Sequence, residues 1–120
     1  MYIDGFLLAA KADRKDDYIE AAKFAAEIFI EHGATRVVEN WSDDVPDGKV
    51  TSFPMAVKLE EGEVVCFSWI EYPDKATRDA CMAASEADPR FEGSMDDVPF
   101  NGARLIMGGF SNVLDLRGEA

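Results

Sequence analysis

The stretch YIDGFLLAA, from Tyr2 to Ala10, decides the fold because it is apolar at both odd and even positions. Side chains along a β-strand alternate between the two faces of its sheet. A strand with one solvent-exposed face would carry a polar residue at every second position. Here Phe6 and Leu7 are both apolar and lie on opposite faces. This pattern predicts a central strand that is covered on both sides.

Residues 14–32 follow this strand and have the periodicity of an amphipathic helix. The apolar stripe recurs at intervals of three and four residues and consists of Tyr18, Ala21, Ala22, Ala25, Ile28, Phe29 and His32. Asp13 stands where a side-chain N-cap belongs, and Gly33 stands where a left-handed residue would end the helix. We therefore expect one long helix between these two residues, packed on the sheet through its stripe.

Further strands and a second helix follow. The segment ATRVVENW, residues 34–41, reads as a strand, and SFPMAVKL and VVCFSWIEY read as two strands around a turn at Glu61 and Gly62. Asp74 can cap a second helix, which Asp88 and the proline after it would end, and residues 92–97 read as a loop. Small side chains share one face of this helix and would allow close packing on the sheet: Ala76, Ala80, Ala83, Ala84 and Ala87.

The order of the elements is strand, helix, strand, strand, helix, strand, with an extra hairpin strand before the third principal one. This is the order of the split βαβ motif. It predicts an α+β fold, a ferredoxin-like βαββαβ sandwich, formed by a single domain over residues 1–120. Right-handed crossovers place both helices on the same face of such a sheet. The other face is apolar but has no cover within one chain, so we expect a second copy to cover it.

The last expected strand lies within PFNGARLIMGGFSNVLDL, residues 99–116, and contains the adjacent glycines Gly108 and Gly109. Glycine inside a strand gives up packing and usually marks a bulge or the close approach of another backbone or a ligand. We therefore expect both glycines at the seam between two copies in a homodimer.

Four separate motifs, TSFPMAV, VVCFSWIEYP, ADPRF and VPFNGARLIMGGF, follow one another in an order and spacing that resemble the YbaA-like family of small bacterial proteins. The similarity extends over nearly the whole chain, from YIDGF to the last strand. It implies a dimeric α+β barrel, the fold shared by antibiotic-biosynthesis monooxygenases and muconolactone isomerases. The family has no established activity, and kinship of fold alone assigns no chemistry.

Charge and composition exclude several classes of partner. The chain has 12 basic and 24 acidic residues, which gives a formal net charge of -12. This charge repels a phosphate backbone and an anionic lipid surface, so we expect neither nucleic acid nor a membrane as a partner. No apolar run reaches the roughly 20 residues that cross a bilayer, and the first residues lack the pattern of a signal peptide. A cytoplasmic location is therefore expected, with Cys66 and Cys81 both reduced.

Few residues offer catalytic or metal chemistry. His32 is the single histidine and is interpreted as a helix-end residue, so we expect no metal and no cofactor. Cys66 lies in a strand that reads as buried, Cys81 lies off the alanine face of its helix, and neither has a neighbouring histidine to activate it. Paired carboxylates in loops are interpreted as solvated charge: Asp43, Asp44, Glu60, Glu61, Asp96 and Asp97.

Polar residues inside apolar strands are the more informative candidates. A buried carboxylate such as Asp4 must be paired or protonated, and Arg36 and Arg104 are the partners that we consider. Two interpretations stay open: a structural ion pair at a strand edge or dimer seam, and a site that orients a ligand. The candidate ligand-binding residues are Asp4, Arg36, Asn40, Ser68, Trp69 and Tyr72.

Two functions follow as hypotheses. Because no catalytic constellation is recognisable, the chain is expected to be a homodimeric module that binds a small molecule. The alternative is a cofactor-free monooxygenase or isomerase that acts on a small, partly aromatic compound, which the resemblance favours by analogy of fold.

Overall fold

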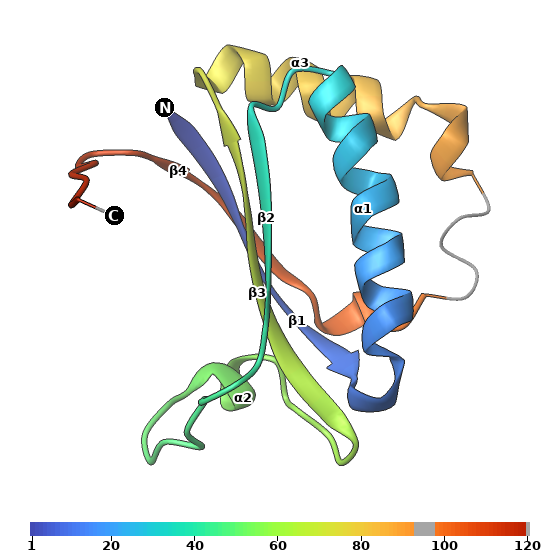
Figure 1. Ribbon diagram of the computed structural model, residues 1–120, viewed down its shortest axis with the longest axis vertical. Coiled ribbons are helices and arrows are strands. Elements are labelled where there is room, and N and C mark those ends of the chain that lie inside the picture. Colours follow the sequence, from blue (N-terminus) through green and yellow to red (C-terminus); the bar gives the residue numbers. More distant parts are fainter. Residues whose placement is uncertain (93–97, 120) are drawn as a thin grey trace.

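The computed structural model describes residues 1–92 and 98–119 (Figure 1). Within these ranges the strands are β1 (Tyr2–Lys11), β2 (Arg36–Trp41), β3 (Glu63–Tyr72) and β4 (Ile106–Ser111). The α-helices are α1 (Lys15–Glu31), α2 (Phe53–Ala56) and α3 (Lys75–Glu86), and short 3₁₀ helices span Ala12–Arg14, Pro89–Phe91 and Gly102–Arg104. The loop expected at residues 92–97 falls, apart from its first residue, outside the described residues.

β1 and β3 form the centre of one antiparallel sheet, whose strand order is β2-β3-β1-β4. These two strands pair over their full length, from Tyr2 opposite Tyr72 to Lys11 opposite Glu63. β4 pairs with the free edge of β1, and β2 pairs with the free edge of β3. The strands that are apolar on both faces are therefore the interior ones, and the prediction of an α+β, ferredoxin-like sandwich is confirmed.

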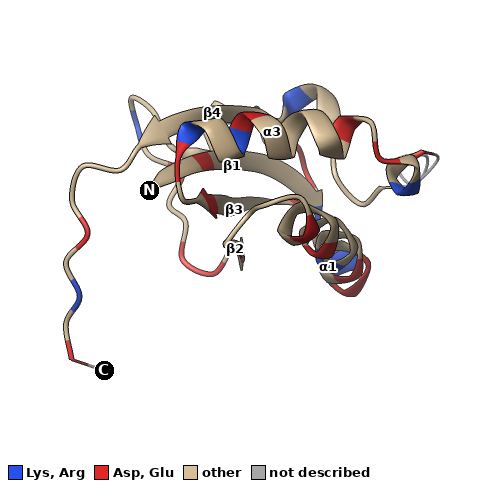
Figure 2. Ribbon diagram, turned by 90° about the horizontal axis from the view of Figure 1, so that it is seen from above, with Lys and Arg blue, Asp and Glu red and all other residues tan. Residues whose placement is uncertain are grey.

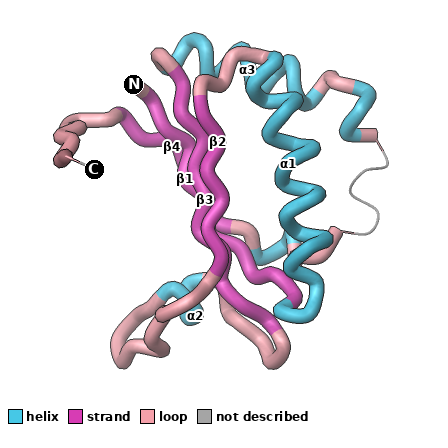
Figure 3. The backbone as a smooth tube through the Cα atoms, viewed as in Figure 1, coloured by secondary structure: helices cyan, strands magenta, loops and turns pink. Residues whose placement is uncertain are grey.

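The two faces of the sheet have different surroundings. α1 and α3 lie on one face, whereas α2 and the C-terminal segment lie on the other (Figures 1 and 3). Leu8 of β1 and Cys66 of β3 pack with Tyr18 of α1 in the core. Tyr72 of β3 belongs to a core cluster with Cys81 of α3. Even-numbered residues of the central strands thus face the long helices.

The sequence predicts the C-terminal end of α1 correctly but not the residue that precedes its N-terminal end. The expected cap at Asp13 is wrong, because the 3₁₀ helix Ala12–Arg14 precedes α1 and Arg14 occupies the N-cap position without a side-chain cap. The expected left-handed end is confirmed, since Gly33 has a φ of +122°. A Cβ at Gly33 would also lie only 3.0 Å from Cγ2 of Thr77 in α3, so glycine suits both the backbone and the contact between the helices.

α3 begins as predicted but packs through a different face. The carboxylate of Asp74 accepts a hydrogen bond from the backbone N–H of Thr77 at 2.7 Å, which confirms the cap. The residues that face the core are Arg78, Cys81 and Ser85, of which the last two are buried. Four alanines of the expected packing face are exposed instead: Ala76, Ala80, Ala83 and Ala87. Small side chains alone do not decide which face of a helix packs on the sheet. In α3 the face that packs is the one from which Arg78 reaches the buried carboxylate of Asp4.

The expected extra hairpin strand is wrong, because its first residues form the one-turn helix α2. The Ser52 hydroxyl accepts a hydrogen bond from the backbone N–H of Met55 at 3.1 Å. Pro54 lies in the first turn of α2, where the missing N–H of proline has no intrahelical partner to lose. A serine cap followed by an early proline is thus the start of a helix. The turn at Gly62 before β3 is confirmed, with a φ of +82°.

The face of the sheet opposite α1 and α3, here called the outer face, is covered at one end by residues next to α2. There Val57 packs on Ala9 and Val65. Elsewhere on this face Phe67 and Phe110 remain 44% and 62% exposed. The C-terminal segment beyond β4 extends away from the body of the molecule (Figure 2). Within the described ranges, much of the outer face is therefore apolar and uncovered.

Charged residues gather on the helices and loops, and the ribbon of the sheet is mostly free of them (Figure 2). α1 carries residues of both signs (Figure 2), and Lys23 and Glu27 are among its exposed ones. None of the helices in the described part of the chain has both the length and the apolar composition needed to cross a membrane.

Candidate functional site

A cavity of about 680 Å³ lies between α1 and the helix-facing side of the sheet. The alanines of α1 leave this space, because larger residues at the same positions would fill it. Its walls are mostly apolar and include Phe6, Leu8 and Ile70 from the sheet, Ala21, Ala22, Ala25 and Phe29 from α1, and Phe91 and Phe100 from the segments that flank residues 93–97.

Glu39 is the carboxylate that the sheet contributes to this cavity. Because side chains alternate along β2, Glu39 shares the helix-facing side with Val37, and it lies opposite Ser68 in the pairing of β2 with β3. The hydroxyl of Tyr18 on α1 donates to Oε1 and Oε2 of Glu39 at 3.2 and 3.3 Å. Three elements thus bring a carboxylate and two hydroxyls to one place.

Desolvation governs the protonation of these groups: Tyr18 and Cys66 are buried, and Glu39 is partly desolvated although it keeps exposed surface. Burial raises the pKa of Glu39, and hydrogen bonds from Tyr18 and Ser68 oppose that shift in part. The pKa of Tyr18 is raised as well, first by burial and then by the charge of Glu39, so its hydroxyl stays a neutral donor. Burial raises the pKa of Cys66 to about 11, so this thiol stays protonated at neutral pH and is no nucleophile.

The arrangement can receive a hydrogen bond or a positive charge from a ligand, or exchange a proton with it. A carboxylate with a raised pKa beside a neutral donor in an apolar cavity suits each of these roles. Over residues 1–92 and 98–119, no group of three or more His, Cys, Asp or Glu side chains is placed to hold a metal ion. The predicted acidic pair Asp96 and Asp97 lies outside those ranges.

Asp4 has a separate set of partners between β1 and α3. Its carboxylate is fully buried, and Oδ2 accepts a hydrogen bond from the hydroxyl of Tyr72 at 2.9 Å. Nε of Arg78 lies 3.1 and 3.2 Å from the two carboxylate oxygens, and Nη2 lies 3.0 Å from Oδ1. The expected partners of Asp4, Arg36 and Arg104, are therefore wrong. The contacts observed are those of a structural ion pair.

The other predicted ligand-binding residues are divided between the two faces of the sheet. Ser68 lines the cavity. Nη1 of Arg36 lies 3.4 Å from a carboxylate oxygen of Glu71, and Nε1 of Trp69 donates to the same oxygen at 2.8 Å. Asn40 donates to a backbone carbonyl of β3 at 3.0 Å. Arg36, Asn40 and Trp69 share the outer face, so the structure does not bring the six residues together.

Gly108 and Gly109 point to opposite faces of β4. A Cβ on Gly108 would lie 3.5 Å from the ring of Phe110, which is an ordinary contact on the outer face. A Cβ on Gly109 would lie 2.6 Å from Nη2 of Arg78 and would also clash with the hydroxyl of Tyr2. The close approach at Gly109 therefore comes from this chain itself, and Gly108 is the glycine that reaches the face where a dimer seam would lie.

Glu39 and Tyr18 are the site residues that the sequence analysis misses. From the sequence, Tyr18 is assigned to the apolar stripe of α1, and Glu39 is not proposed as a site residue. A signal for Glu39 does exist, because it shares one face of its strand with Val37 and Trp41. A carboxylate between two large apolar residues on one face indicates an acid on the helix-facing side of the sheet.

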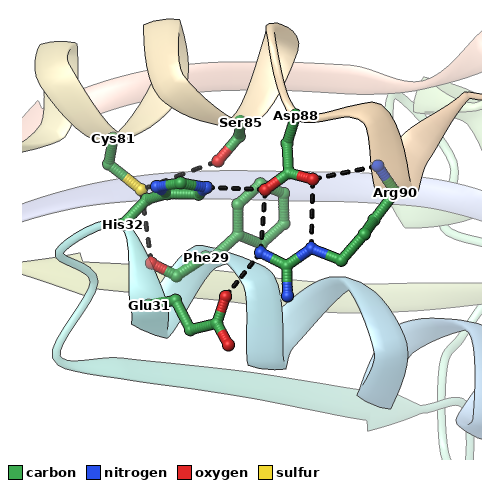
Figure 4. Close-up of polar contacts among 7 residues, drawn as sticks. All are labelled: Phe29, Glu31, His32, Cys81, Ser85, Asp88 and Arg90. Carbon is green, nitrogen blue, oxygen red and sulfur yellow. Dashed lines mark hydrogen bonds and ion pairs between the residues drawn. The ribbon is translucent and has the colours of Figure 1, made fainter.

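His32 joins a polar cluster that links the end of α1 to the segment after α3 (Figure 4). Its Nε2 lies 2.8 Å from Oδ2 of Asp88. Arg90 donates from Nε to Oδ1 of Asp88 at 3.0 Å and from Nη2 to Oδ2 at 2.8 Å, and it also contacts Glu31. Hydrogen bonds from Arg90 and then from His32 hold the pKa of Asp88 well below its usual range. This geometry agrees with a helix-end role for His32.

The chain belongs to a family described as "Protein of unknown function (DUF1428)", which matches residues 1–102. The matched residues include β1 to β3, both long helices, the carboxylate of Glu39 and the ion pair of Asp4 with Arg78. The family is thus defined over most of the residues that line the cavity, whereas Leu105 and Met107 lie beyond the matched range.

Two relatives confirm the resemblance to YbaA-like proteins. The "Uncharacterized protein YbaA" of Escherichia coli (strain K12) is 54% identical over 114 residues, which are 95% of this chain and 97% of the relative. The protein of the same name from Shigella flexneri has the same identity and coverage. The crystal structure of protein Atu4242 from Agrobacterium tumefaciens is similar with a TM-score of 0.56 and 14% identity over 94% of each chain, which supports the fold alone.

Proposed function

We propose that this chain is a small-molecule-binding module that acts as a homodimer, and that the cavity between α1 and the sheet is its binding site. The observation that carries the proposal is the cavity of about 680 Å³ with Glu39, Tyr18 and Ser68 along its wall. Sites for small molecules are typically apolar pockets of about 300 to 1,000 Å³ with a few well-placed polar groups.

The walls of the cavity favour a ligand that carries a ring. Phe6, Phe29 and Phe100 line it from different elements, and aromatic side chains pack well against other rings at an angle or with an offset. The alanines opposite them keep the space open on the α1 side. A small, partly aromatic compound fits both walls.

A cavity-filling variant tests the proposal. Ala25→Leu adds a branched side chain inside the cavity while keeping a residue of high helix propensity on α1. In ligand-observed NMR with a panel of small aromatic fragments that includes indole, we expect the wild type to bind several fragments. We expect Ala25→Leu to bind the same fragments about tenfold more weakly or not at all.

Ala83→Leu is the matched control, because Ala83 is exposed on α3 and faces no part of the cavity. This variant should bind fragments like the wild type. Binding that Ala25→Leu leaves unchanged, or a wild type that binds no fragment, would contradict the proposed site.

A second candidate function is supported by the raised pKa of Glu39 beside the neutral hydroxyl of Tyr18. A base of this kind could remove a proton from an enolisable ligand, as an isomerase or a cofactor-free monooxygenase requires. Deuterium exchange from D₂O into the acidic C–H of a bound cyclic ketone separates the two functions. Exchange that is accelerated by the wild type and lost in Glu39→Gln supports catalysis, and exchange at the uncatalysed rate supports binding alone.

The homodimer in this proposal would cover the outer face. That face carries exposed Phe67 and Phe110, and a two-fold related copy of the chain would cover such an apolar face with an equally apolar one. We also place the protein in the cytoplasm, since Cys66 and Cys81 are both free thiols, which a reducing compartment preserves.

A further inference from the structure

We propose that the cavity between α1 and the sheet selects ligands that carry a positively charged amine on an apolar, ring-bearing body. The inference rests on the proposed function and adds the chemical class of the ligand. It follows from the kind of polar groups that line the cavity, from the partners of Glu39 and from the charge of the whole chain.

Acidic side chains prevail among the charged residues along the described cavity wall. Glu39, Asp17 and Glu20 are the carboxylates, and Arg14 at the start of α1 supplies positive charge. Arg14 is paired with Asp17 through Nε at 2.9 Å. An anionic ligand would therefore meet carboxylates on entering, whereas a cation would be attracted.

Glu39 has hydrogen-bond donors but no counter-ion among the residues that the structure describes. The single O–H of Tyr18 is shared between the two oxygens of Glu39, at 3.2 and 3.3 Å, and Ser68 supplies a further donor. Of the ion pairs formed within the described ranges, none includes Glu39. An ionised carboxylate can accept about four hydrogen bonds, so Glu39 retains acceptor capacity that points to the cavity.

A ligand ammonium group supplies what this carboxylate lacks. Glu39 keeps exposed surface but is partly desolvated by its apolar neighbours. A partly desolvated carboxylate without an opposite charge is less stable than one in water, and an ammonium group within hydrogen-bond distance offsets that cost. A hydrogen bond between two charged groups is roughly twice as strong as one between neutral groups. The ring of Tyr18, 5.6 Å from the ring of Trp41 between centroids, adds an aromatic surface beside the same carboxylate. Aromatic faces attract cations as well.

The charge of the whole chain favours a cationic ligand as well. The chain carries a net charge of -12, which raises the local concentration of small cations around it. One cation of the protein, the ammonium group of Lys15, lies on the Trp41 ring, 5.8 Å from its centroid, and the described cavity wall does not include Trp41.

Three probes of matched shape test the inference: 2-phenylethylamine, 2-phenylethanol and 3-phenylpropanoate, which are cationic, neutral and anionic at pH 7. We expect the wild-type protein to bind the amine at least about tenfold more tightly than the alcohol, and the carboxylate most weakly, by titration calorimetry or NMR. In Glu39→Gln, which keeps the size of the side chain, the preference for the amine should fall to within about threefold.

A control variant makes the result specific to the charge of Glu39. Glu27→Gln removes a carboxylate on the exposed side of α1 and should behave like the wild type. If the alcohol binds as tightly as the amine, or if Glu39→Gln keeps the full preference, the inference is overturned while the binding site stands. If no probe binds, the proposed function fails together with the inference.

Discussion

At the scale of single residues, Asp4 explains features of three elements. Its fully buried carboxylate needs a counter-charge, and Arg78 of α3 supplies it with two nitrogens. The guanidinium also lies 5.1 Å from the centroid of the Tyr2 ring. Side chains from α3 and β1 therefore crowd the backbone of β4, and glycine at position 109 leaves room for them.

This crowding gives opposite predictions for two neighbouring glycines. In Gly109→Ala the new Cβ would clash with the hydroxyl of Tyr2 and lie 2.6 Å from Nη2 of Arg78. Both side chains must shift, and Arg78 then moves relative to a carboxylate that has no access to water. Breaking a buried ion pair outright costs about 3–5 kcal/mol, and we expect this partial displacement to lower the free energy of unfolding by about 1–3 kcal/mol. Urea unfolding measured by circular dichroism checks the value.

Gly108→Ala serves as the control, because its Cβ would make only ordinary contacts with Phe110. Alanine is normally better than glycine within a strand by about 0.5–1 kcal/mol, so this variant should be as stable as the wild type or more stable. If Gly109→Ala is equally stable, Arg78 is not held in place as the structure shows.

The sequence predicts that Asp4 is paired, but not with which residue. A carboxylate in an apolar strand must find a partner, and this follows from solvation alone. Its partner comes from a helix 74 residues later in the chain, and which helix face meets the sheet depends on packing that the local pattern does not contain. The same holds for Tyr18 and Glu39, which meet across two elements.

At the scale of elements, the polar cluster of His32, Asp88 and Arg90 connects the C-terminal ends of α1 and α3 (Figure 4). Asp88 is central to it, because its carboxylate accepts hydrogen bonds from both other side chains and also from the backbone N–H of Arg90 at 2.9 Å. The side chain of Asp88 is only 7% exposed, although its partners reach solvent. The cluster therefore orients one helix end relative to the other.

The lowered pKa of Asp88 predicts an acid dependence of stability. A carboxyl group whose pKa is lower in the folded than in the unfolded state stabilises the fold above its unfolded pKa, which is about 4. That contribution is lost as the pH falls from there toward the folded pKa. In Asp88→Asn, which keeps an oxygen for the backbone cap, we expect lower stability than in the wild type at pH 7. The difference between the two proteins should shrink steadily below about pH 4.

Urea unfolding between pH 7 and pH 2.5 measures this difference directly. Glu27→Gln on the exposed side of α1 is the comparison, and it should change stability little at any pH in that range. A penalty for Asp88→Asn that is the same at pH 7 and at pH 3 would show that the charge of Asp88 is not what stabilises the helix ends.

The end of a helix or strand is predictable from sequence where it depends on one residue and on the backbone groups within a few positions of it. Gly33 and Asp74 are of this kind, since a left-handed φ and a side-chain cap involve residues within one turn. The extra 3₁₀ helix Ala12–Arg14 is not, because the chain there must turn from the edge of β1 toward a helix whose position is set by the core. For α2 the serine cap and the proline are sufficient to predict the start of a helix. The apolar residues after them favour a strand, which the structure does not contain.

At the scale of the whole molecule, the strand order follows from apolar patterning of β1 and β3, which had to be interior. The same patterning leaves the outer face with apolar side chains and no cover over much of its area in the described chain. Residues that line this face include Ile3, Leu7, Phe67, Ile106 and Phe110. Monomeric proteins rarely expose contiguous apolar patches larger than a few hundred Å². The C-terminal segment beside it carries exposed Val113 and Leu114, which enlarge the apolar surface.

We therefore expect the protein to form a dimer through the outer face, with light scattering at micromolar concentration giving twice the chain mass of 13.2 kDa. Phe67→Glu places an unpaired carboxylate at the centre of that face, where burial costs several kcal/mol, so the dimer should dissociate with a constant raised on the order of a hundredfold. Ile30→Glu is the matched control, since Ile30 is 52% exposed on α1, away from the outer face, and its variant should stay dimeric. A wild-type mass equal to one chain, or a dimer that Ile30→Glu disrupts and Phe67→Glu does not, would rule out the outer face as the interface.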